Sequence, residues 1–155
     1  YAGLTGKEIV LDAYCGTGTI GMIASRKAGR VIGVEVNADA VRDAKFNASR
    51  NNVKNIDFFT ADASDFMVEM AEAGEKAEVV IMDPPRAGSD KRFINAAVTL
   101  GPEKIVYVSC NPETLARDLN CFVQNGYKVK RIQPVDMFPH THHIECACLL
   151  IRKGG

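Results

Sequence analysis

Strand and helix patterns alternate along the whole sequence, and this alternation restricts the fold more than any other feature. Short apolar runs predict strands at residues 9–13, 30–36, 56–61, 77–82 and 104–109. Each run is followed by a segment that we expect to be helical, at residues 19–28, 38–51, 64–73, 90–100 and 112–125. Five such strand–helix units predict a mainly parallel sheet with helices on both faces.

The last two expected strands, residues 127–133 and 145–152, have no helix between them. A connection too short for a helical crossover predicts that this pair is antiparallel. We therefore expect an α/β fold with a mainly parallel, doubly wound sheet of about seven strands and an antiparallel last strand.

The size and composition indicate one domain without a large basic surface. The chain has 155 residues and a formal net charge of zero, so any affinity for nucleic acid must come from a local patch or from protein outside this sequence. No apolar run approaches the ~20 residues that span a bilayer. Five cysteines without a secretory signal indicate free thiols in a cytoplasmic protein. Residues 1–6 resemble the tail of a helix that ends at a glycine, so we expect a fragment.

Polar or reactive residues are expected at the carboxyl ends of all five parallel strands. They are Asp12, Glu35, Asp62, Asp83 and Cys110. Ligands of parallel sheets bind beyond this edge, near the point where the strand order reverses. Five such residues at one edge, which we call the rim, predict a binding site.

The sequence CGTGTIG at residues 15–21 contains the pattern G-x-G-x-x-G. Gly16 and Gly18 allow a tight turn and close approach of the backbone to a ligand, and the helix that begins at Thr19 offers unpaired N–H groups. A dinucleotide site would also need an acidic residue at the end of the second strand, where Glu35 could accept ribose hydroxyls. The alternative is a tight turn that binds nothing.

Two carboxylates favour S-adenosylmethionine over a nicotinamide dinucleotide. Asp12 precedes the glycines, where it would repel a pyrophosphate and attract a cationic amino acid head group. Asp62 is suited to accept from an adenine amino group. S-adenosylmethionine carries adenine, ribose and a positive sulfonium but no phosphate, so an acidic rim fits it. A nicotinamide-dependent oxidoreductase and a non-catalytic cofactor-binding or RNA-docking module remain as alternatives.

A thiol and a carboxylate at two strand ends indicate chemistry on a pyrimidine ring. Cys110 lies in the sequence SCNP at residues 109–112, where a strand leads into a turn and proline begins a helix. The N-terminus of a helix favours a thiolate. Glu145 follows the sequence FPHTHHI and could act as a base. The alternative for Cys110 is a small buried hydrophobe, the role expected of Cys121 and Cys148.

The sequence DPPR at residues 83–86 follows the fourth strand. Its two prolines stiffen the loop and hold Asp83 at the rim, where the carboxylate could contact a ring N–H such as N3–H of uracil. Amino-directed methyltransferases carry a similar motif with an aromatic residue after the prolines. Arg86 stands there instead and disfavours amine methylation. The alternative for Asp83 is a cap or turn carboxylate.

Three histidines, His140, His142 and His143, lie close to a Cys-x-Cys sequence at residues 146–148. The chain has no C-x-x-C pair, so we expect no metal site. The histidines are expected to order the loop before Glu145, with His143 nearest the pocket.

Together these motifs resemble the RNA uracil-5-methyltransferases, which use S-adenosylmethionine to form 5-methyluridine in tRNA and 23S rRNA. The resemblance spans nearly the whole chain and rests on four motifs in order. They are DAYCGTG at residues 12–18, DPPRAG at 83–88, SCNPETLARD at 109–118 and FPHTHHIE at 138–145.

The resemblance implies the Rossmann-like class I methyltransferase fold, with Cys110 as nucleophile and Glu145 as general base. Asp83, Arg86 and His143 would lie against the uracil. The implied partner is a structured loop of rRNA or tRNA, bound by a monomeric enzyme. The cofactor would be bound by residues at the ends of the first four strands: Tyr14, Gly16, Gly18, Thr19, Glu35, Asp62 and Asp83.

Two differences between this sequence and related methyltransferases make the expected base and the extent of the chain more specific. RNA cytosine-5-methyltransferases are similar but carry a second cysteine after the proline of the fourth-strand motif. Here Pro85 is followed by Arg86, so uracil is the expected base. Members of the uracil family also carry an RNA-binding barrel, a central segment and a cofactor-contacting glutamine before the catalytic domain. None of these is in this sequence, so we expect the catalytic domain of a longer protein.

Overall fold

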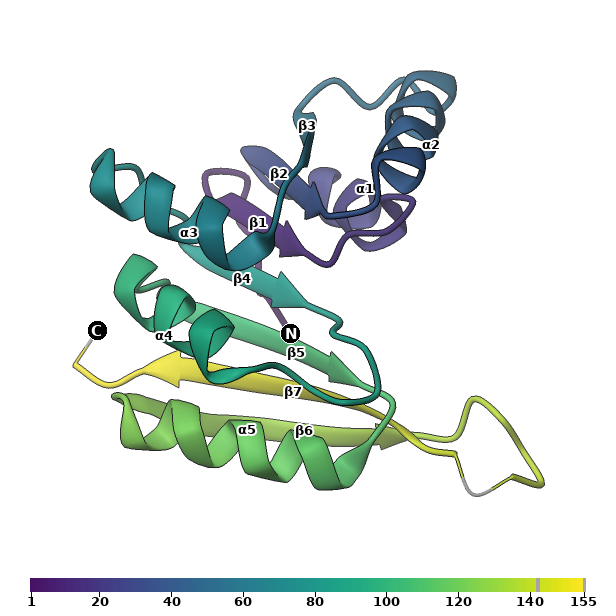
Figure 1. Cartoon of the computed structure of the whole chain (residues 1–155). Helices are drawn as coiled ribbons and strands as arrows, with labels where there is room; N and C mark the ends of the chain where they lie inside the picture. Colours follow the sequence, from purple (N-terminus) through teal and green to yellow (C-terminus); the bar gives the residue numbers. More distant parts are fainter. Residues whose placement is uncertain (142, 155) are drawn as a thin grey trace.

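The computed structural model describes residues 1–141 and 143–154, and within them seven strands and five helices alternate (Figure 1). The strands are β1 (Ile9–Ala13), β2 (Arg30–Glu35), β3 (Ile56–Thr60), β4 (Val79–Met82), β5 (Lys104–Ser109), β6 (Tyr127–Val135) and β7 (Glu145–Arg152). The helices are α1 (Thr19–Ser25), α2 (Ala38–Arg50), α3 (Ala63–Glu72), α4 (Lys91–Leu100) and α5 (Pro112–Gln124). The seven expected strands and the five helices expected to follow the parallel strands are present, with boundaries that differ by a few residues.

All seven strands form one sheet in the order β3-β2-β1-β4-β5-β7-β6. The pairs among β1 to β5 are parallel, whereas β7 is antiparallel to both of its neighbours. The expected α/β fold with an antiparallel last strand is confirmed. The sequence did not indicate that β7 would lie between β5 and β6, and this insertion determines the geometry of the site.

Helices cover both faces of the sheet (Figure 1). On one face α3, α4 and α5 bury Met67, Phe93 and Phe122 against the strands. On the other face α2 buries Val41 and Ala44, with α1 beside it. Among the residues that the structure describes, no helix has both the length and the apolar character needed to cross a membrane.

Side-chain caps begin α2, α3, α4 and α5. Asn37, the expected cap of α2, accepts hydrogen bonds from two N–H groups of the first turn. Asp62 caps α3 in the same way, and Asp90 and Asn111 each accept one such hydrogen bond at the start of α4 and α5. A side-chain cap contributes about 1 kcal/mol. Because each cap ends a loop that leaves a strand, the caps also hold these loops at the rim.

Residues 1–6 are not helical, contrary to the expectation of a helix tail. Gly3 and Gly6 have φ angles of 59° and 101°, which a right-handed helix excludes. Ala2 and Leu4 pack against the buried cluster on the α1–α2 face. The Ala2 carbonyl accepts a hydrogen bond of 2.9 Å from Nζ of Lys104. Tertiary contacts therefore determine the path of this segment.

Candidate active site

Cys110 and Glu145 are brought together by the insertion of β7 next to β5. These antiparallel strands pair Ser109 with Cys146. Cys110 directly follows Ser109 and Glu145 directly precedes Cys146, so both residues adjoin the last pair of this ladder. Both residues are partly buried. The predicted nucleophile and base therefore lie at the same end of neighbouring strands, although a helix and a strand separate them in the sequence.

Asp83 joins them from β4, the other neighbour of β5. It follows Met82, the last residue of β4, and keeps part of its surface exposed. Partial burial raises the pKa of the Asp83 carboxyl, and the nearby Glu145 carboxylate raises it further. Both causes disfavour the charged form of Asp83, because burial removes solvent and like charges repel.

A hollow of about 350 Å³ opens beside Cys110. Its walls come from the loop after β4, the start of α5 and the segment before β7: Arg86, Cys110, Asn111, Pro112, Glu113, His143 and Ile144. Arg86 reaches across it, and its Nη1 lies 3.4 Å from Nδ1 of His143. The structure therefore brings together Cys110, Arg86 and His143, as predicted from the sequence.

The glycine-rich loop is tied to the end of β2 through Glu35. Gly16 and Gly18 have φ angles of 52° and 83°, which favour glycine. The Glu35 carboxylate accepts a hydrogen bond of 3.1 Å from the Gly16 amide and one of 2.9 Å from the Asn37 amide. A Cβ added at Gly16 would meet no atom within 4 Å. The loop therefore presents open backbone beside a carboxylate.

Asp62 caps α3 at the rim. Its Oδ1 accepts hydrogen bonds from the amides of Ser64 at 2.8 Å and Asp65 at 3.2 Å. Nη1 of Arg92 lies 3.7 Å from the same oxygen. Because these contacts all use Oδ1 and the residue is exposed, Oδ2 can still accept from a ligand. Binding of adenine by Asp62 stays a prediction.

Tyr14 and Thr19 have different surroundings. The Tyr14 backbone has a φ of 61°, and its ring stacks on Phe93 with centroids 5.0 Å apart. Burial raises the pKa of the Tyr14 hydroxyl to about 12, so it remains a hydrogen-bond donor at neutral pH. Thr19 is exposed and borders a hollow that α1 forms with residues 51–55, before β3. A cofactor contact by Thr19 stays a prediction.

Asp12 lies beneath the glycine-rich loop and not on the rim surface. Its exposed fraction is 1%, and its Oδ2 accepts no hydrogen bond. A Cβ added at Gly21 would lie 2.8 Å from this oxygen, so the absence of a side chain at Gly21 makes room for the carboxyl. Almost none of its surface is accessible, so Asp12 offers no direct contact at the rim, and its attraction of a cationic head group stays a prediction.

Asp12 should make the stability of the protein depend on pH. Burial raises its pKa to about 7, the Gly21 amide lowers it, and the Asp83 carboxylate raises it. An unfolded aspartate has a pKa near ~3.9, so between these values only the folded state keeps the proton. As the pH rises from the unfolded to the folded pKa of Asp12, the free energy of unfolding should fall by up to about 4 kcal/mol. Above the folded pKa, the loss that Asp12 causes should stay constant.

Urea unfolding of Asp12→Asn between pH 5 and 8 tests this expectation. The variant lacks the titrating group, so its stability relative to the wild type should rise with pH. Asp57→Asn, at an exposed ion pair with Arg30, is the matched control and should keep the wild-type pH dependence. A difference between Asp12→Asn and wild type that is equal at pH 5 and pH 8 would contradict the raised pKa.

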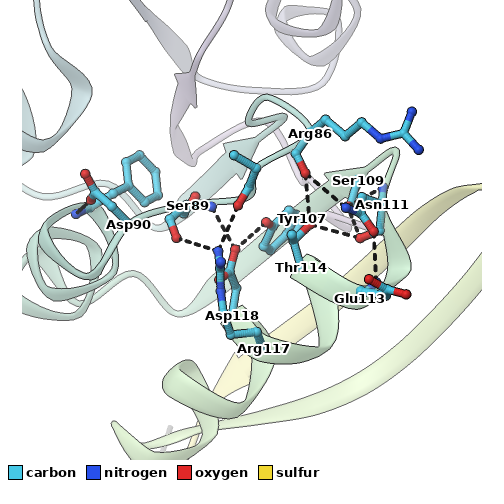
Figure 2. Close-up of polar contacts among 12 residues, drawn as sticks. Arg86, Ser89, Asp90, Tyr107, Ser109, Asn111, Glu113, Thr114, Arg117 and Asp118 are labelled. Carbon is cyan, nitrogen blue, oxygen red and sulfur yellow. Dashed lines mark hydrogen bonds and ion pairs between the residues drawn. The ribbon is translucent and has the colours of Figure 1, made fainter.

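A buried acidic residue on α5 was missed by the sequence interpretation. Asp118 has an exposed fraction of 1% and accepts hydrogen bonds from three other residues (Figure 2). The signal was present, because Asp118 shares the buried face of α5 with Leu115, Leu119 and Phe122. A carboxylate on the apolar face of a helix is expected to be buried with partners.

The cysteines other than Cys110 serve the core, and all five are unpaired. Cys146 and Cys148 are buried on one face of β7, and Cys121 packs against the core. Of the three histidines near β7, His142 lies outside the described residues. In the described parts of the chain, no group of three or more His, Cys, Asp or Glu residues could hold a metal ion.

Comparisons with known proteins show what the chain is similar to. The family model described as tRNA (Uracil-5-)-methyltransferase matches residues 4–153. The chain is 50% identical to an uncharacterized RNA methyltransferase of Clostridium tetani over 99% of its length. It is 52% identical to another of Caldanaerobacter subterraneus subsp. tengcongensis over 98% of its length. The chain spans 34% of each of these proteins.

A solved structure also resembles the chain. It is the crystal structure of the Pyrococcus abyssi tRNA (uracil-54, C5)-methyltransferase in complex with S-adenosyl-L-homocysteine. The TM-score is 0.82 and the sequence identity 37%, over 97% of this chain and 36% of that one.

Proposed function

The chain belongs to the tRNA (uracil-5-)methyltransferase family, and on this basis we propose that it transfers a methyl group from S-adenosylmethionine to carbon 5 of a uridine in rRNA or tRNA. The observation that carries this proposal is the β5–β7 pairing of Ser109 with Cys146, since Cys110 and Glu145 are the residues next to this pair. Asp83 joins them from β4. The family match favours methyl transfer over the nicotinamide-dependent alternative.

The residues of the rim fit S-adenosylmethionine. Glu35 and Asp62 offer carboxylate oxygens suited to ribose hydroxyls and an adenine amino group, and open backbone at Gly16 leaves room for a ligand. The other proposed cofactor contacts on this side come from Tyr14, Gly18, Thr19 and Asp83. When bound, S-adenosylmethionine supplies a methyl group on a positively charged sulfur. Carboxylate side chains would attract that charge and would repel a pyrophosphate.

Cys110 and Glu145 would divide the chemistry between them. Carbon 5 of uracil is a weak nucleophile, so we propose that the Cys110 thiolate first bonds to carbon 6. The electrons of the C5–C6 double bond then move toward O4, and the resulting enolate makes carbon 5 nucleophilic. After methylation of carbon 5, Glu145 removes its proton. The electrons of that C–H bond re-form the double bond and expel the Cys110 thiolate.

Asp83, Arg86 and His143 would hold the base. Asp83 lies near Glu145 and can hydrogen-bond the N3–O4 edge of uracil. Arg86 and His143 line the hollow beside Cys110 and can contact the base or a flanking phosphate. The target uridine must leave its stack to enter this hollow, which is easiest in an RNA loop.

The curated relatives are about three times as long as this chain, which spans 34% of them. We propose that residues 1–155 are the catalytic domain of a longer protein whose other parts select the RNA. This proposal agrees with the neutral net charge of the chain. Experiments on activity should therefore use the complete gene product.

The release of tritium from RNA labelled at carbon 5 of uridine tests the proposed function. Only a reaction that replaces the carbon 5 hydrogen releases this label, and mapping of the product locates the methylated nucleotide. Calorimetry with S-adenosylhomocysteine and with NAD tests the cofactor separately. Binding of NAD alone, or the absence of tritium release with total cellular RNA, would count against the proposal.

Glu35→Gln should weaken the binding of S-adenosylhomocysteine by about 100-fold, because it removes the charged acceptor of two ribose hydrogen bonds. Titration calorimetry measures this change directly. Asp57→Asn removes a carboxylate from β3, outside the proposed site, and should bind like the wild type. Equal affinities of Glu35→Gln and Asp57→Asn would exclude Glu35 from the cofactor site.

A further inference from the structure

We propose that Asp118 is a positioning residue of the reaction, which acts by fixing the loop of Asp83 and Arg86 to the helix that follows Cys110. This inference rests on the proposed function. It concerns residues 83–90, which we call the DPPR loop, and α5.

Asp118 holds the far end of the DPPR loop directly through Oδ2 and indirectly through Oδ1, which binds Arg117 (Figure 2). Its Oδ2 accepts hydrogen bonds of 2.7 Å from the Ser89 amide and from the Tyr107 hydroxyl. Its Oδ1 accepts from Nε of Arg117 at 2.8 Å. Nη2 of Arg117 donates in turn to the carbonyls of Ala87 at 3.0 Å and Ser89 at 3.1 Å. One buried carboxylate thus organises the end of the loop.

The near end of the loop is attached to the beginning of the same helix. The carbonyl of Arg86 accepts hydrogen bonds from Nδ2 of Asn111 at 3.2 Å and from the Thr114 hydroxyl at 3.3 Å. Asn111 also caps α5 and directly follows Cys110. The loop that carries Asp83 and the turn that carries Cys110 are therefore joined at two places along α5.

The packing leaves the loop little freedom at its far attachment. Gly88 has a φ of 76°, and a Cβ there would lie 2.6 Å from Oδ2 of Asp118 and 2.7 Å from Nη2 of Arg117. The backbone thus lies directly against the ion pair. The Arg117–Asp118 pair has one exposed and one buried partner, so solvent competes weakly for the carboxylate.

These contacts matter for the reaction because Asp83 and Cys110 must act on opposite edges of one base. The loop after β4 carries its residues outside regular structure, so the sheet alone does not set their distance from Cys110. The hydrogen bonds that attach the loop to α5 set this distance instead. A misplacement of about 1 Å at a reacting group can cost about 100-fold in rate.

Asp118→Asn tests the proposal in the complete gene product. An amide keeps one acceptor oxygen, so the hydrogen bonds of either Oδ1 or Oδ2 are lost. We expect kcat for tritium release to fall about 10- to 100-fold. The affinity for S-adenosylhomocysteine, measured by calorimetry, should change less than threefold, because no hydrogen bond of Asp118 reaches the ends of β1, β2 or β3. Amide exchange of Gly88 and Ser89, measured by NMR, should become at least tenfold faster.

Asp39→Asn is the matched control, since Asp39 also pairs with an arginine at 2.7 Å but lies exposed on α2. It should leave kcat, affinity and exchange unchanged. If Asp118→Asn does not fold, Tyr107→Phe takes its place, since it removes one hydrogen bond to Asp118 and keeps the ion pair. We then expect a loss of kcat of about three- to tenfold with faster exchange at Ser89.

The outcomes separate the two proposals. If the wild type releases no tritium, the proposed function fails, and amide exchange alone then decides whether Asp118 holds the loop. Exchange at Gly88 and Ser89 as slow in the variant as in the wild type would overturn the positioning role. A fall in kcat matched by an equal fall in cofactor affinity would also overturn it, because it would indicate general loss of structure.

Discussion

Cys110→Ala should abolish methyl transfer and leave cofactor binding intact. The variant lacks the sulfur that would bond to carbon 6, so carbon 5 of uracil stays a weak nucleophile. We expect the rate of tritium release to fall by at least about 10⁴-fold, as when other covalent nucleophiles are removed. The affinity for S-adenosylhomocysteine should stay within threefold of the wild type, because Cys110 follows β5 and the cofactor residues lie mainly at β1, β2 and β3.

Cys121→Ala provides the control for this variant. Cys121 is also a partly buried free thiol, but it lies within α5. Its removal should leave the rate of tritium release unchanged. If Cys110→Ala and Cys121→Ala lowered activity and cofactor affinity alike, Cys110 would be a packing residue and the covalent mechanism would be wrong.

Glu145→Gln should trap the RNA on the protein. Methylation of carbon 5 can still occur in this variant, but no carboxylate removes the carbon 5 proton, and Cys110 cannot leave until that proton is gone. We expect turnover to fall about 10²- to 10³-fold. A covalent protein–RNA adduct should accumulate with S-adenosylmethionine, visible as a shifted band on a denaturing gel.

Two further variants test the assignment of the base. Glu75→Gln alters an exposed glutamate after α3 and should neither slow turnover nor trap RNA. The double variant Cys110→Ala, Glu145→Gln should form no adduct, because the bond to carbon 6 requires the thiol. Free RNA from Glu145→Gln under denaturing conditions, together with slow turnover, would mean that Glu145 acts before the covalent bond forms. Wild-type turnover of Glu145→Gln would remove it from the mechanism.

Much of the fold could be predicted because its signals are local. The apolar runs, the cap at Asn37 and the proline at the start of α5 each depend on residues close in the sequence. The family was also predicted correctly, since its motifs are short and lie at strand ends. The non-helical path of residues 1–6 could not be predicted, because contacts with Lys104 and the core determine it.

The buried carboxylates show where local patterns were insufficient. Asp12 and Asp118 have nearly the same exposed fraction, yet Asp118 has hydrogen-bond partners on both oxygens and Oδ2 of Asp12 has none. Whether a buried carboxylate finds hydrogen-bond donors depends on the residues that the fold places next to it. For Asp118 these are Tyr107 and the DPPR loop, which lie on other elements.

By itself, the sequence determined the α/β class and the family, because periodicity and short motifs are properties of neighbouring residues. It also predicted the reactive residues, which the variants proposed above test. It also indicated that β6 and β7 would be antiparallel. Only the tertiary structure decided that β7 lies between β5 and β6. The antiparallel register of β7 on β5 depends on backbone hydrogen bonds between distant segments, and its last pair, Ser109 with Cys146, adjoins both Cys110 and Glu145. The thiol of Cys110 and the carboxylate of Glu145 could therefore be recognised in the sequence, but their proximity in space could not.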